Sequence, residues 1–408
     1  MRPLVVSQTP PQPGHTNGRE RRNRLFVGGL AQHCDRIDIL HFTAPGFFAE
    51  KRDQGYETQA VWGVSGTSTF VPMRARQETV FNHYVAGIFS VAEEKTFFPL
   101  LGPQQLAATR DALATKPDLI FVDQIHCMQP VLALNPTMPI LFGMDDIIHR
   151  VQWRMATTKP FRPAKLAYAA QVPAIVSVEQ RAVSRAVITA VCSEQDRRFI
   201  AALGAGKRAI VIPNAIAMPP TPPSIPGTPT VLFLSYHLYN PNRVAAERLI
   251  RNIWPLIRQQ CPQARLLLAG TGTEALRDIP TNEGGIEYLG YAPDLAALYA
   301  ETRVVCCPLT VGGFTRLKLI EAAAFGRPMV STRIGAEGLD FIDGSEILLR
   351  DTDTDNDFAK GCISLLQDFT LCASLGTAAR KKMATLYEAG VIQQRIADLV
   401  EGILGSLA

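Results

Sequence analysis

Long apolar runs are missing from this sequence of 408 residues. No run approaches the ~20 residues that cross a bilayer. The apolar stretch after Met1-Arg2-Pro3 is also too short for the core of a signal peptide. We therefore expect no transmembrane helix and a cytoplasmic location.

Cysteine and histidine patterns that mark disulfide frameworks or metal sites are missing too. The eight cysteines include the adjacent Cys306 and Cys307 but no C-x-x-C pair, and no two of the seven histidines have the spacing of a zinc site. Aromatic residues make up only 8% and charged residues 19%, against 47% hydrophobic residues, which is typical of a globular protein and excludes a disordered or fibrous one. We expect reduced thiols and no metal.

The distribution of proline and charge predicts two domains, as does the length. Six prolines fall within eleven residues, at Pro219, Pro220, Pro222, Pro223, Pro226 and Pro229. This density predicts an extended linker over residues 217–230. The first 216 residues carry 24 basic and 17 acidic side chains, and the remainder 17 and 20, which favours an anionic partner for the front half.

Short apolar runs alternate with helical segments on both sides of the linker. The runs are continuous, as in strands buried on both faces of a parallel sheet. The predicted strands are residues 4–7, 37–42, 119–123, 140–144, 187–192 and 210–213, and then 231–236, 265–269, 286–289, 304–307, 328–331 and 347–349. The sequence therefore predicts two doubly wound α/β domains.

Two helices have clear signals, and they complete the predicted domain layout. Ser193 can cap a helix that runs to residue 203 before Gly204. Ile392, Ile396 and Val400 recur at helical spacing, which predicts an amphipathic C-terminal helix. The predicted parts are a domain over residues 1–216, the linker, a domain over residues 231–385, and the terminal helix in residues 386–408.

A glycine-rich loop follows the predicted strand 304–307. Gly312 and Gly313 allow close approach of the backbone, and Thr315 can cap the next helix, whose free N–H groups suit a phosphate. Arg316 and Lys318 add positive charge where it opposes the helix dipole, which makes more sense if an anion binds there. A plain salt bridge between Lys318 and Glu321 is an equally good interpretation of the spacing.

This loop resembles the donor-binding domain of retaining GT-B glycosyltransferases of family 4. The likeness rests on residues 309–332, 286–295 and 334–339, is dense from residue 231 to about 368, and extends weakly to 187–214. It implies two Rossmann-like domains that face a central cleft. It also implies a UDP- or GDP-linked sugar as the substrate, with no separate cofactor.

The resemblance assigns roles to individual residues. Glu321 matches the glutamate that holds the ribose hydroxyls, while the glutamate that contacts the donor sugar falls on Gly313. The family's diphosphate-binding Arg and Lys are missing from the loop that contains Ser235, and we expect Arg316 and Lys318 to replace them as catalytic charges. The residues expected to bind the nucleotide sugar are Gly18, Ser235, Asn240, Gly270, Gly272, Tyr291, Gly312, Gly313, Phe314, Thr315, Arg316, Lys318 and Glu321.

Three stretches also permit other interpretations. Gly270-Thr271-Gly272 imitates a dinucleotide fingerprint, but no acidic residue ends the next strand. Residues 351–357 imitate a calcium loop but lack its glycine and its final glutamate, so they favour a helix N-terminus instead. Asn242 is expected to cap a helix that begins near Arg243, with a donor contact by Asn240 or His237 as a secondary role.

In the first domain, Asp123 and His126 are the candidate catalytic residues. The position of the family's sugar-contacting histidine falls on Asp123, and His126 follows three residues later. Asp145 and Asp146 end the next predicted strand and can orient an acceptor hydroxyl, and Glu179 is expected to be a structural partner. The arginines after Gly18, with aromatic residues between 81 and 98, suit either solvent or the inner face of a membrane, and solvent is favoured.

These observations predict a metal-independent, retaining hexosyltransferase. It would move a sugar from a nucleotide diphosphate to an acceptor hydroxyl in exopolysaccharide, lipid-linked glycan or other glycoconjugate synthesis, with no nucleic-acid partner. A non-catalytic or weakly active sugar-nucleotide-binding protein is the first alternative, because of Gly313. An NAD-dependent oxidoreductase is the second.

Overall fold

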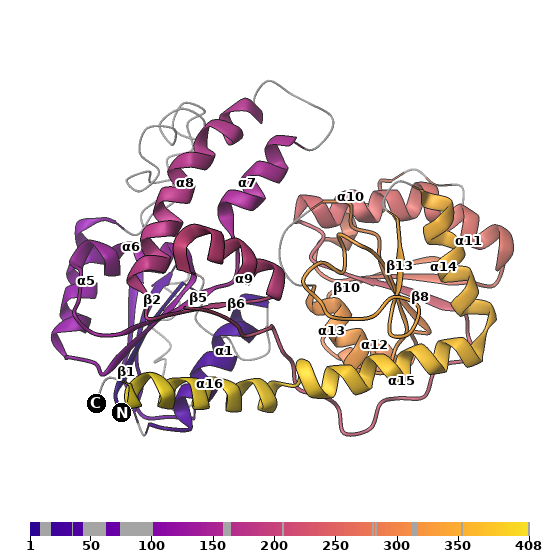
Figure 1. Ribbon diagram of the computed structural model, residues 1–408. Coiled ribbons are helices and arrows are strands. Elements are labelled where there is room, and N and C mark those ends of the chain that lie inside the picture. The colour runs from indigo at the N-terminus through magenta and orange to yellow at the C-terminus, as the bar shows by residue number, and fades with distance from the viewer. Residues whose placement is uncertain are drawn as a thin grey trace. The chain divides into compact units, whose positions relative to one another are not determined.

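The computed structural model describes residues 1–8, 18–34, 36–43, 63–73, 101–157, 165–205, 208–279, 281, 284–311, 316–351 and 354–406. The chain forms two compact units (Figure 1). The first comprises residues 1–214 together with 392–408, and the second comprises residues 215–391. The boundary therefore lies two residues before the predicted one, and most of the C-terminal helix belongs to the first unit.

The first unit contains a parallel sheet of seven strands in the order β3-β2-β1-β4-β5-β6-β7. The strands are β1 (Pro3–Ser7), β2 (Asp38–Thr43), β3 (Ser68–Pro72), β4 (Leu119–Asp123), β5 (Ile140–Met144), β6 (Ile188–Val191) and β7 (Ala209–Val211). Six were predicted within two residues of their ends. β3 was missed because it is a half-exposed edge strand with a polar start. Strand order reverses between β1 and β4, the point where such sheets bind ligands.

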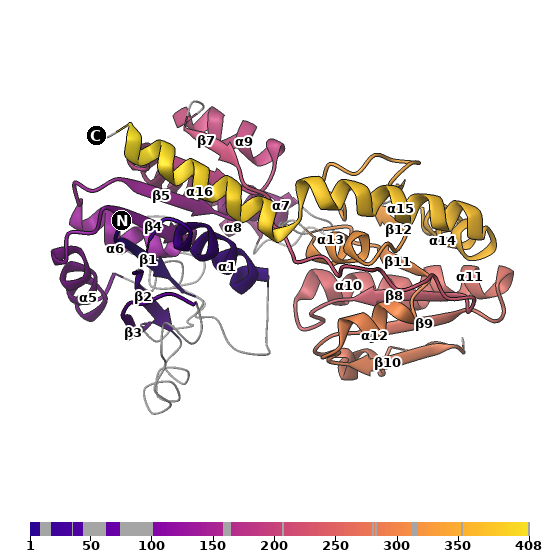
Figure 2. The same cartoon turned by 90° about the horizontal axis from the view of Figure 1, so that it is seen from below.

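Helices cover both faces of this sheet (Figures 1 and 2). They are α1 (Gly18–Ala31), α5 (Pro103–Ala114), α6 (Gln124–Leu134), α7 (Ile148–Thr157), α8 (Lys165–Arg185), α9 (Glu194–Ile200) with the π-turn η2 (Ala201–Ala205), and α16 (Ala389–Gly405). Val122 packs in one core with residues of α6 and α8. Phe26 of α1 stacks on Phe121 at 4.5 Å, and because adjacent strand residues face opposite ways, α1 covers the other face.

The C-terminal helix α16 packs against α1. Gly28 and Gly29 lie against Gln393 and Ile396, where a Cβ atom would come within 2.8 Å of those residues. Ile392, Ile396 and Val400 are buried, so the predicted apolar stripe is confirmed. The helix begins at Ala389, three residues after the predicted start.

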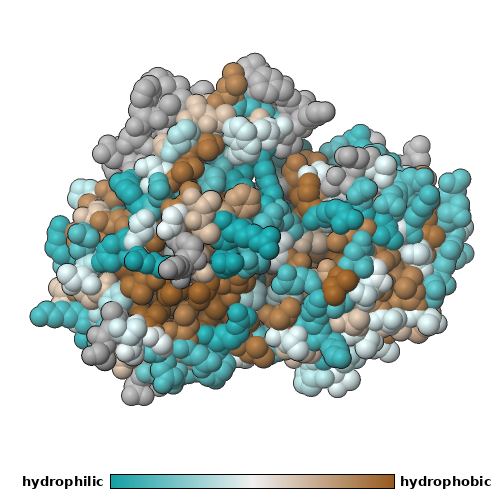
Figure 3. Space-filling model, in the orientation of Figure 1, coloured by the Kyte–Doolittle hydropathy of each residue, from teal (hydrophilic) through white to brown (hydrophobic). Residues whose placement is uncertain are grey.

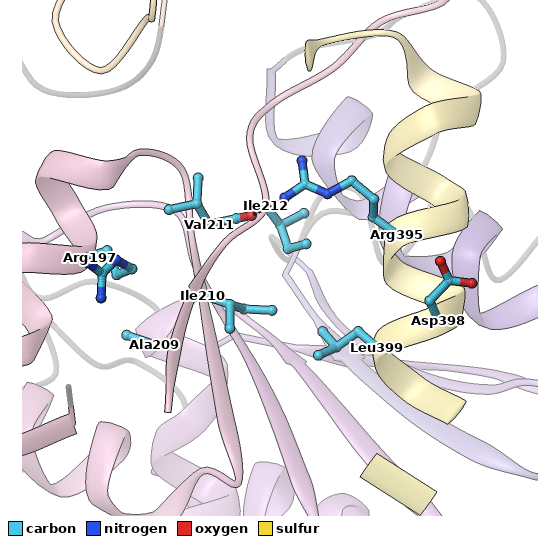
Figure 4. Close-up of a pocket in the computed structure, with 8 residues that line it drawn as sticks. All are labelled: Arg197, Ala209, Ile210, Val211, Ile212, Arg395, Asp398 and Leu399. Carbon is cyan, nitrogen blue, oxygen red and sulfur yellow. Dashed lines mark hydrogen bonds between the residues drawn. The ribbon is translucent and has the colours of Figure 1, made fainter. Parts of the chain in front are cut away.

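A hollow of about 570 Å³ opens between the edge strand β7 and α16 (Figure 4). Its apolar floor includes Ile210 and Leu399, and Arg395 at its rim donates a hydrogen bond to the carbonyl of Val211 (3.0 Å). On the face shown in Figure 3, apolar residues gather on this unit among hydrophilic ones. No predicted site residue lines the hollow.

The second unit contains a parallel sheet of six strands in the order β10-β9-β8-β11-β12-β13. The strands are β8 (Thr230–Leu234), β9 (Arg265–Ala269), β10 (Ile286–Gly290), β11 (Val304–Cys307), β12 (Met329–Thr332) and β13 (Leu348–Arg350). All six were predicted. Strand order reverses between β8 and β11.

Helices α10 (Asn240–Arg248), α11 (Trp254–Gln260), α12 (Leu295–Ala300), α13 (Leu317–Ala324), α14 (Asp355–Gln367) and α15 (Phe369–Leu386) complete this unit, with the π-turn η3 (Leu249–Ile253) and the 3₁₀ turn η4 (Thr273–Leu276). The predicted cap at Asn242 is wrong. α10 begins at Asn240 with Pro241 in its first turn, where proline is well tolerated, and the Asn242 amide donates to the Tyr236 carbonyl (2.9 Å). The Ser193 cap is confirmed by its bond from the Asp196 N–H (3.1 Å).

The proline-rich segment is fixed to the second unit by three arginines, which corrects the prediction of a separate linker. Arg380 donates to the carbonyls of Pro219 and Pro220 (2.6 and 3.2 Å), and Arg327 donates to those of Pro223 and Ser224 (both 2.9 Å). Arg303 donates to the carbonyl of Pro226 (3.0 Å). Proline offers only a carbonyl, so guanidinium groups with several donors match this segment well.

Three further features concern the cysteines, metal binding and membrane-spanning helices. All eight cysteines are free. Within the described ranges, no three or more His, Cys, Asp or Glu side chains are grouped as a metal would require. In the same ranges no one helix has the length and apolarity to cross a bilayer, and α14 and α15 reach that threshold only as a pair bent by 102°.

We predict that Arg327→Ala destabilises the second unit. Arg327 is fully buried and also donates to the Tyr299 carbonyl (2.8 Å). The change would leave buried carbonyls without donors, and we expect the free energy of unfolding to fall by about 3 kcal/mol in urea denaturation. Arg333→Ala, an exposed matched control, should cost less than about 1 kcal/mol. Equal losses for both variants would contradict this interpretation.

Candidate functional site

A hydrogen bond joins the two sides of the strand reversal in the second unit. Lys318 lies in the first turn of α13, which follows β11, and Ser235 directly follows β8. The Lys318 ammonium donates to the Ser235 hydroxyl (Nζ–Oγ 2.8 Å). The residue at the N-cap of α13 is Arg316, and Thr315, the predicted cap, lies outside the described residues.

Lys318 is a half-buried residue whose ammonium group is largely removed from water. Burial lowers its pKa to about 8, and the positive charge of Arg316 acts in the same direction, while Glu321 opposes it. The ammonium also lies 4.5 Å from the centre of the Phe233 ring, a cation–π contact. Within the part of the chain that the structure describes, no carboxylate lies within ion-pair distance of Lys318. The site therefore holds a positive charge whose partner is a neutral hydroxyl.

The loop after β9 packs tightly against the loop after β8. Gly270 has φ +109°, and a Cβ atom there would lie 1.9 Å from the Ser235 carbonyl oxygen. The N–H of Ser235 donates to the Ala269 carbonyl (2.9 Å), which holds the two loops together. Gly272 has φ +88° and meets Leu238. Both glycines are thus required by packing, and β9 is not at the strand reversal, which weakens the dinucleotide interpretation.

His237 is a structural residue of this loop. Its Nε2 contacts the Ala269 carbonyl (3.0 Å), so Nε2 carries the proton. Burial lowers the pKa of His237 to about 4, and the imidazole is therefore neutral at physiological pH. Its ring also meets Phe233 edge-on at 5.6 Å. A direct donor contact by His237 is not supported.

The loop after β12, which the residue-by-residue reasoning did not single out, anchors the segment after β11. The Thr332 hydroxyl donates to the Leu309 carbonyl and accepts the N–H of Gly335 (2.8 Å). A Cβ atom on Gly335 would lie 2.5 Å from the Ser331 hydroxyl, so glycine is needed. The sequence signal was the succession of Thr332 and Gly335 after a buried strand.

The structure brings together part of the predicted binding set. Ser235, Gly270 and Lys318 meet, and Arg316 and Glu321 are buried and act electrostatically on Lys318. Other predicted members lie apart from these contacts: Asn240 is exposed at the start of α10, Tyr291 is half-exposed after β10, and Gly18 begins α1 of the first unit. Gly312, Gly313, Phe314 and Thr315 lie outside the described residues.

At the strand reversal of the first unit stands a buried carboxyl group. Asp123 ends β4, and the Ser7 hydroxyl at the end of β1 donates to it (3.2 Å). Asn23 donates in turn to Ser7 (2.6 Å). Burial raises the pKa of Asp123 to about 7, and the charge of Asp145 adds to this rise. Such raised values are common at functional sites.

Gln124 connects Asp123 to Asp145 through an unusual backbone. Its φ of +72° lies in the left-handed region, which costs a residue with a side chain about 1 kcal/mol or more. Its amide donates to the Asp145 carboxylate (3.3 Å). Sequence reasoning missed this residue, because glutamine carries no signal for a left-handed conformation. His126 lies in the first turn of α6 and is half-buried.

Glu179 of α8 holds the start of α7. It is fully buried and accepts the N–H groups of Ile148 (2.6 Å) and His149 (3.3 Å). Its second oxygen contacts Nδ1 of His149. The expectation that Glu179 is a structural partner is thus confirmed, while His149 was not singled out.

Comparisons with known proteins agree with this architecture. Residues 228–368 match the family model described as "Glycosyl transferases group 1". No curated protein gives a significant match. Sucrose-phosphate synthase from Thermosynechococcus elongatus has 18% identity and a TM-score of 0.72, with 100% of both chains covered.

Two other solved structures are similar over the whole chain. Anabaena HepE in complex with UDP and glucose has 14% identity and a TM-score of 0.66, and 98% of this chain and 99% of that one are covered. S. aureus TarM, a mutant in complex with fondaparinux, alpha-GlcNAc-glycerol and UDP, has 12% identity and a TM-score of 0.67, with 98% and 99% covered. The chain therefore has the GT-B fold, and the comparisons support a glycosyltransferase.

We predict that Asp123→Asn stabilises the protein more at pH 8 than at pH 4. The folded-state pKa of about 7 lies above the ordinary 3.8, so the stability contributed by the proton on Asp123 is lost as the pH rises through this window. The difference in melting temperature between variant and parent should therefore grow with pH. Asp111→Asn, on an exposed position of α5, is the control and should show no such growth. A difference that stays constant or shrinks would refute the raised pKa.

Proposed function

We propose that the protein is a retaining glycosyltransferase that uses a nucleotide-diphosphate sugar. The observation that carries this proposal is the Lys318 ammonium, half-buried at the strand reversal of the second unit and bonded to the neutral Ser235 hydroxyl. Parallel sheets bind ligands at such reversals. A buried cation is costly, and an anion bound beside it offsets that cost.

The diphosphate is the part of the substrate that fits this position. Lys318 and Arg316 lie at the N-terminal end of α13, where backbone N–H groups and the helix dipole also favour negative charge. Their charges stabilise the diphosphate as it leaves the sugar, which is where electrostatic catalysis acts. In this proposal two side chains and one helix end provide the neutralisation, and no metal is needed.

The remaining roles follow the family 4 resemblance. Glu321, buried in α13, would hold the ribose hydroxyls. The acceptor hydroxyl would attack on the face from which the diphosphate leaves, which retains the configuration of the sugar. Solved structures of similar fold contain UDP with glucose, or UDP with fondaparinux and alpha-GlcNAc-glycerol, which supports the proposal of a UDP-linked sugar and a glycan or glycoconjugate acceptor. A cytoplasmic location and contact with a membrane stay predictions.

A calorimetric screen of UDP-, GDP- and ADP-sugars tests the proposal, with NAD as the competing ligand. Binding of one nucleotide sugar, followed by release of its nucleoside diphosphate, would support the enzyme. Binding with no turnover would favour the sugar-nucleotide-binding alternative suggested by Gly313. Binding of NAD alone would overturn the proposal.

We predict that the double variant Arg316→Ala/Lys318→Ala weakens nucleotide diphosphate binding by about 100-fold or more. Each substitution removes a charge-assisted hydrogen bond to the diphosphate, which contributes about 1.5–3 kcal/mol to binding. A loss of about 1.4 kcal/mol raises Kd tenfold. Titration calorimetry with UDP and GDP provides the measurement. Lys381→Ala, an exposed lysine of α15, is the control and should bind normally. Unchanged affinity in the double variant would place the diphosphate elsewhere.

We also predict that affinity for the diphosphate falls as the pH rises above about 8, because Lys318 loses its charge there. The pKa of Lys318 is lowered, so the free protein is progressively neutral at this position in alkaline solution. The diphosphate itself keeps its charge, since its last proton leaves near pH 6. Kd measured between pH 7 and pH 9.5 should rise for the parent protein. Lys318→Met should bind the diphosphate weakly, with a Kd that is nearly constant over the same pH range. A parallel rise of Kd in both proteins would exclude Lys318 as the cause.

A further inference from the structure

Lys318 has the surroundings of a lysine that can act as a nucleophile. Its Nζ bonds to the Ser235 hydroxyl (2.8 Å) and lies 4.5 Å from the centre of the Phe233 ring. Neither partner carries a full negative charge that would hold the amine in its protonated form. Partial removal from water, together with the positive charge of Arg316, favours the neutral amine. The Ser235 contact also holds the nitrogen at a defined position.

The titratable groups around this amine come from three parts of the second unit. They are Arg316 and Glu321 of α13, Cys306 and Cys307 of β11, and His237 in the loop after β8. Burial raises the pKa of Cys306 well above its ordinary value and lowers that of His237 to about 4, so both are neutral at pH 7. The full charges that act on Lys318 are therefore those of Arg316, which favours loss of the proton, and Glu321, which opposes it.

A pKa of about 8 gives Lys318 a large neutral fraction in mild solution. At pH 8 about half of its amines are unprotonated, against roughly 0.4% for an ordinary lysine with a pKa near 10.4. Only the unprotonated amine attacks a carbonyl carbon. We therefore expect Lys318 to react faster than the exposed lysines Lys360 and Lys381 with an electrophile that reaches it.

The charges of the site favour an electrophile that carries a phosphate. Lys318 lies in the first turn of α13, with Arg316 at the N-cap, and helix N-termini favour anions. In the proposed function these groups stabilise a departing diphosphate, and they would stabilise a departing phosphate in the same way. An acyl phosphate has a reactive carbonyl carbon bonded directly to such a leaving group. One small molecule thus supplies both the anion and the electrophile.

We propose that Lys318 is a site of covalent modification by acyl phosphates, and that its acylation switches off diphosphate binding. This inference rests on the proposed function, because it assigns a regulation to the same site. In the step, the unprotonated Nζ forms a bond to the acyl carbon, and the bond from that carbon to the phosphate oxygen breaks. The electron pair leaves with the phosphate, and the amine proton passes to water. The product is a neutral amide, so the site loses the charge of Lys318.

The first experiment measures acetylation of the full-length protein by acetyl phosphate between pH 7 and pH 9.5. Mass spectrometry of digested samples gives an initial rate for each lysine. At pH 8 Lys318 should react at least about tenfold faster than Lys360 and Lys381. Its rate should level off above about pH 9, where its amine is already neutral, while the rates of the two exposed lysines keep rising.

The second experiment tests whether the phosphate directs the reaction. Inorganic pyrophosphate should slow the acetylation of Lys318 and leave that of Lys360 and Lys381 unchanged. Arg316→Ala should lower the Lys318 rate with acetyl phosphate more than the rate with p-nitrophenyl acetate, which carries no phosphate. Arg251→Ala, at an exposed position of η3, is the matched control and should change neither rate. The pyrophosphate comparison needs no variant, so it decides the matter if Arg316→Ala does not fold.

The third experiment measures what the modification does to binding. Titration calorimetry uses UDP or GDP, whichever the untreated parent binds more tightly. In protein acetylated at Lys318 the Kd should rise about tenfold or more, because a charge-assisted hydrogen bond is lost. Lys318→Arg keeps a positive charge but has no amine to acetylate. Treated and untreated samples of this variant should therefore have the same Kd.

The outcomes separate this inference from the proposed function. Acetylation of Lys318 no faster than that of Lys360 and Lys381, or acetyl groups on Ser235 in its place, would overturn the inference while nucleotide-sugar binding stands. Absence of pyrophosphate protection, or an unchanged Kd after acetylation of Lys318, would overturn it as well. If Lys318 is acetylated selectively and protected by pyrophosphate but the parent binds no nucleotide, the modified anion site stands and the proposed function falls.

Discussion

The chemistry of the second unit depends on one constraint: a half-buried lysine lies at the point where strand order reverses. Its ammonium is held by a serine hydroxyl and an aromatic ring, not by a carboxylate. The glycine loop after β9 must stay small because it packs directly on that serine. The arrangement holds a positive charge in place in a partly desolvated position, where its attraction for an anion is stronger than it would be in water.

The same position in the first unit carries an acidic group instead of a basic one. There a serine at the end of the first strand meets Asp123 instead of a lysine. Both contacts cross the reversal between the first strand of the unit and the strand that returns beside it. One fold thus builds a cationic and an acidic site from the same topological position, and side-chain identity alone sets the sign. Near the acidic site, Gln124 has a left-handed backbone and the His149 ring is held by a carboxylate, so the tertiary structure also constrains the residues around it.

Three arginines of the second unit have a structural role that is separate from both sites. Three guanidinium groups bind the carbonyls of a segment whose prolines have no N–H to donate. A segment that composition alone marks as a free linker is therefore fixed to one unit. One of them, Arg327, is fully buried, so the binding of this segment involves the interior of the unit and not only its surface.

The sequence by itself determined the α/β class, twelve of the thirteen described strands and the amphipathic terminal helix, because buried parallel strands and helix stripes leave continuous local patterns. It also pointed to Lys318 and Ser235, through a glycine loop and a family resemblance. Only the tertiary structure decided that these two residues touch, that Gln124 is left-handed, and that Glu179 orients His149. Lys318 and Ser235 are 83 positions apart, Gln124 and its partner Asp145 are 21 apart, and His149 and Glu179 are 30 apart. No local pattern encodes which distant side chains meet when the strands of one sheet align their ends.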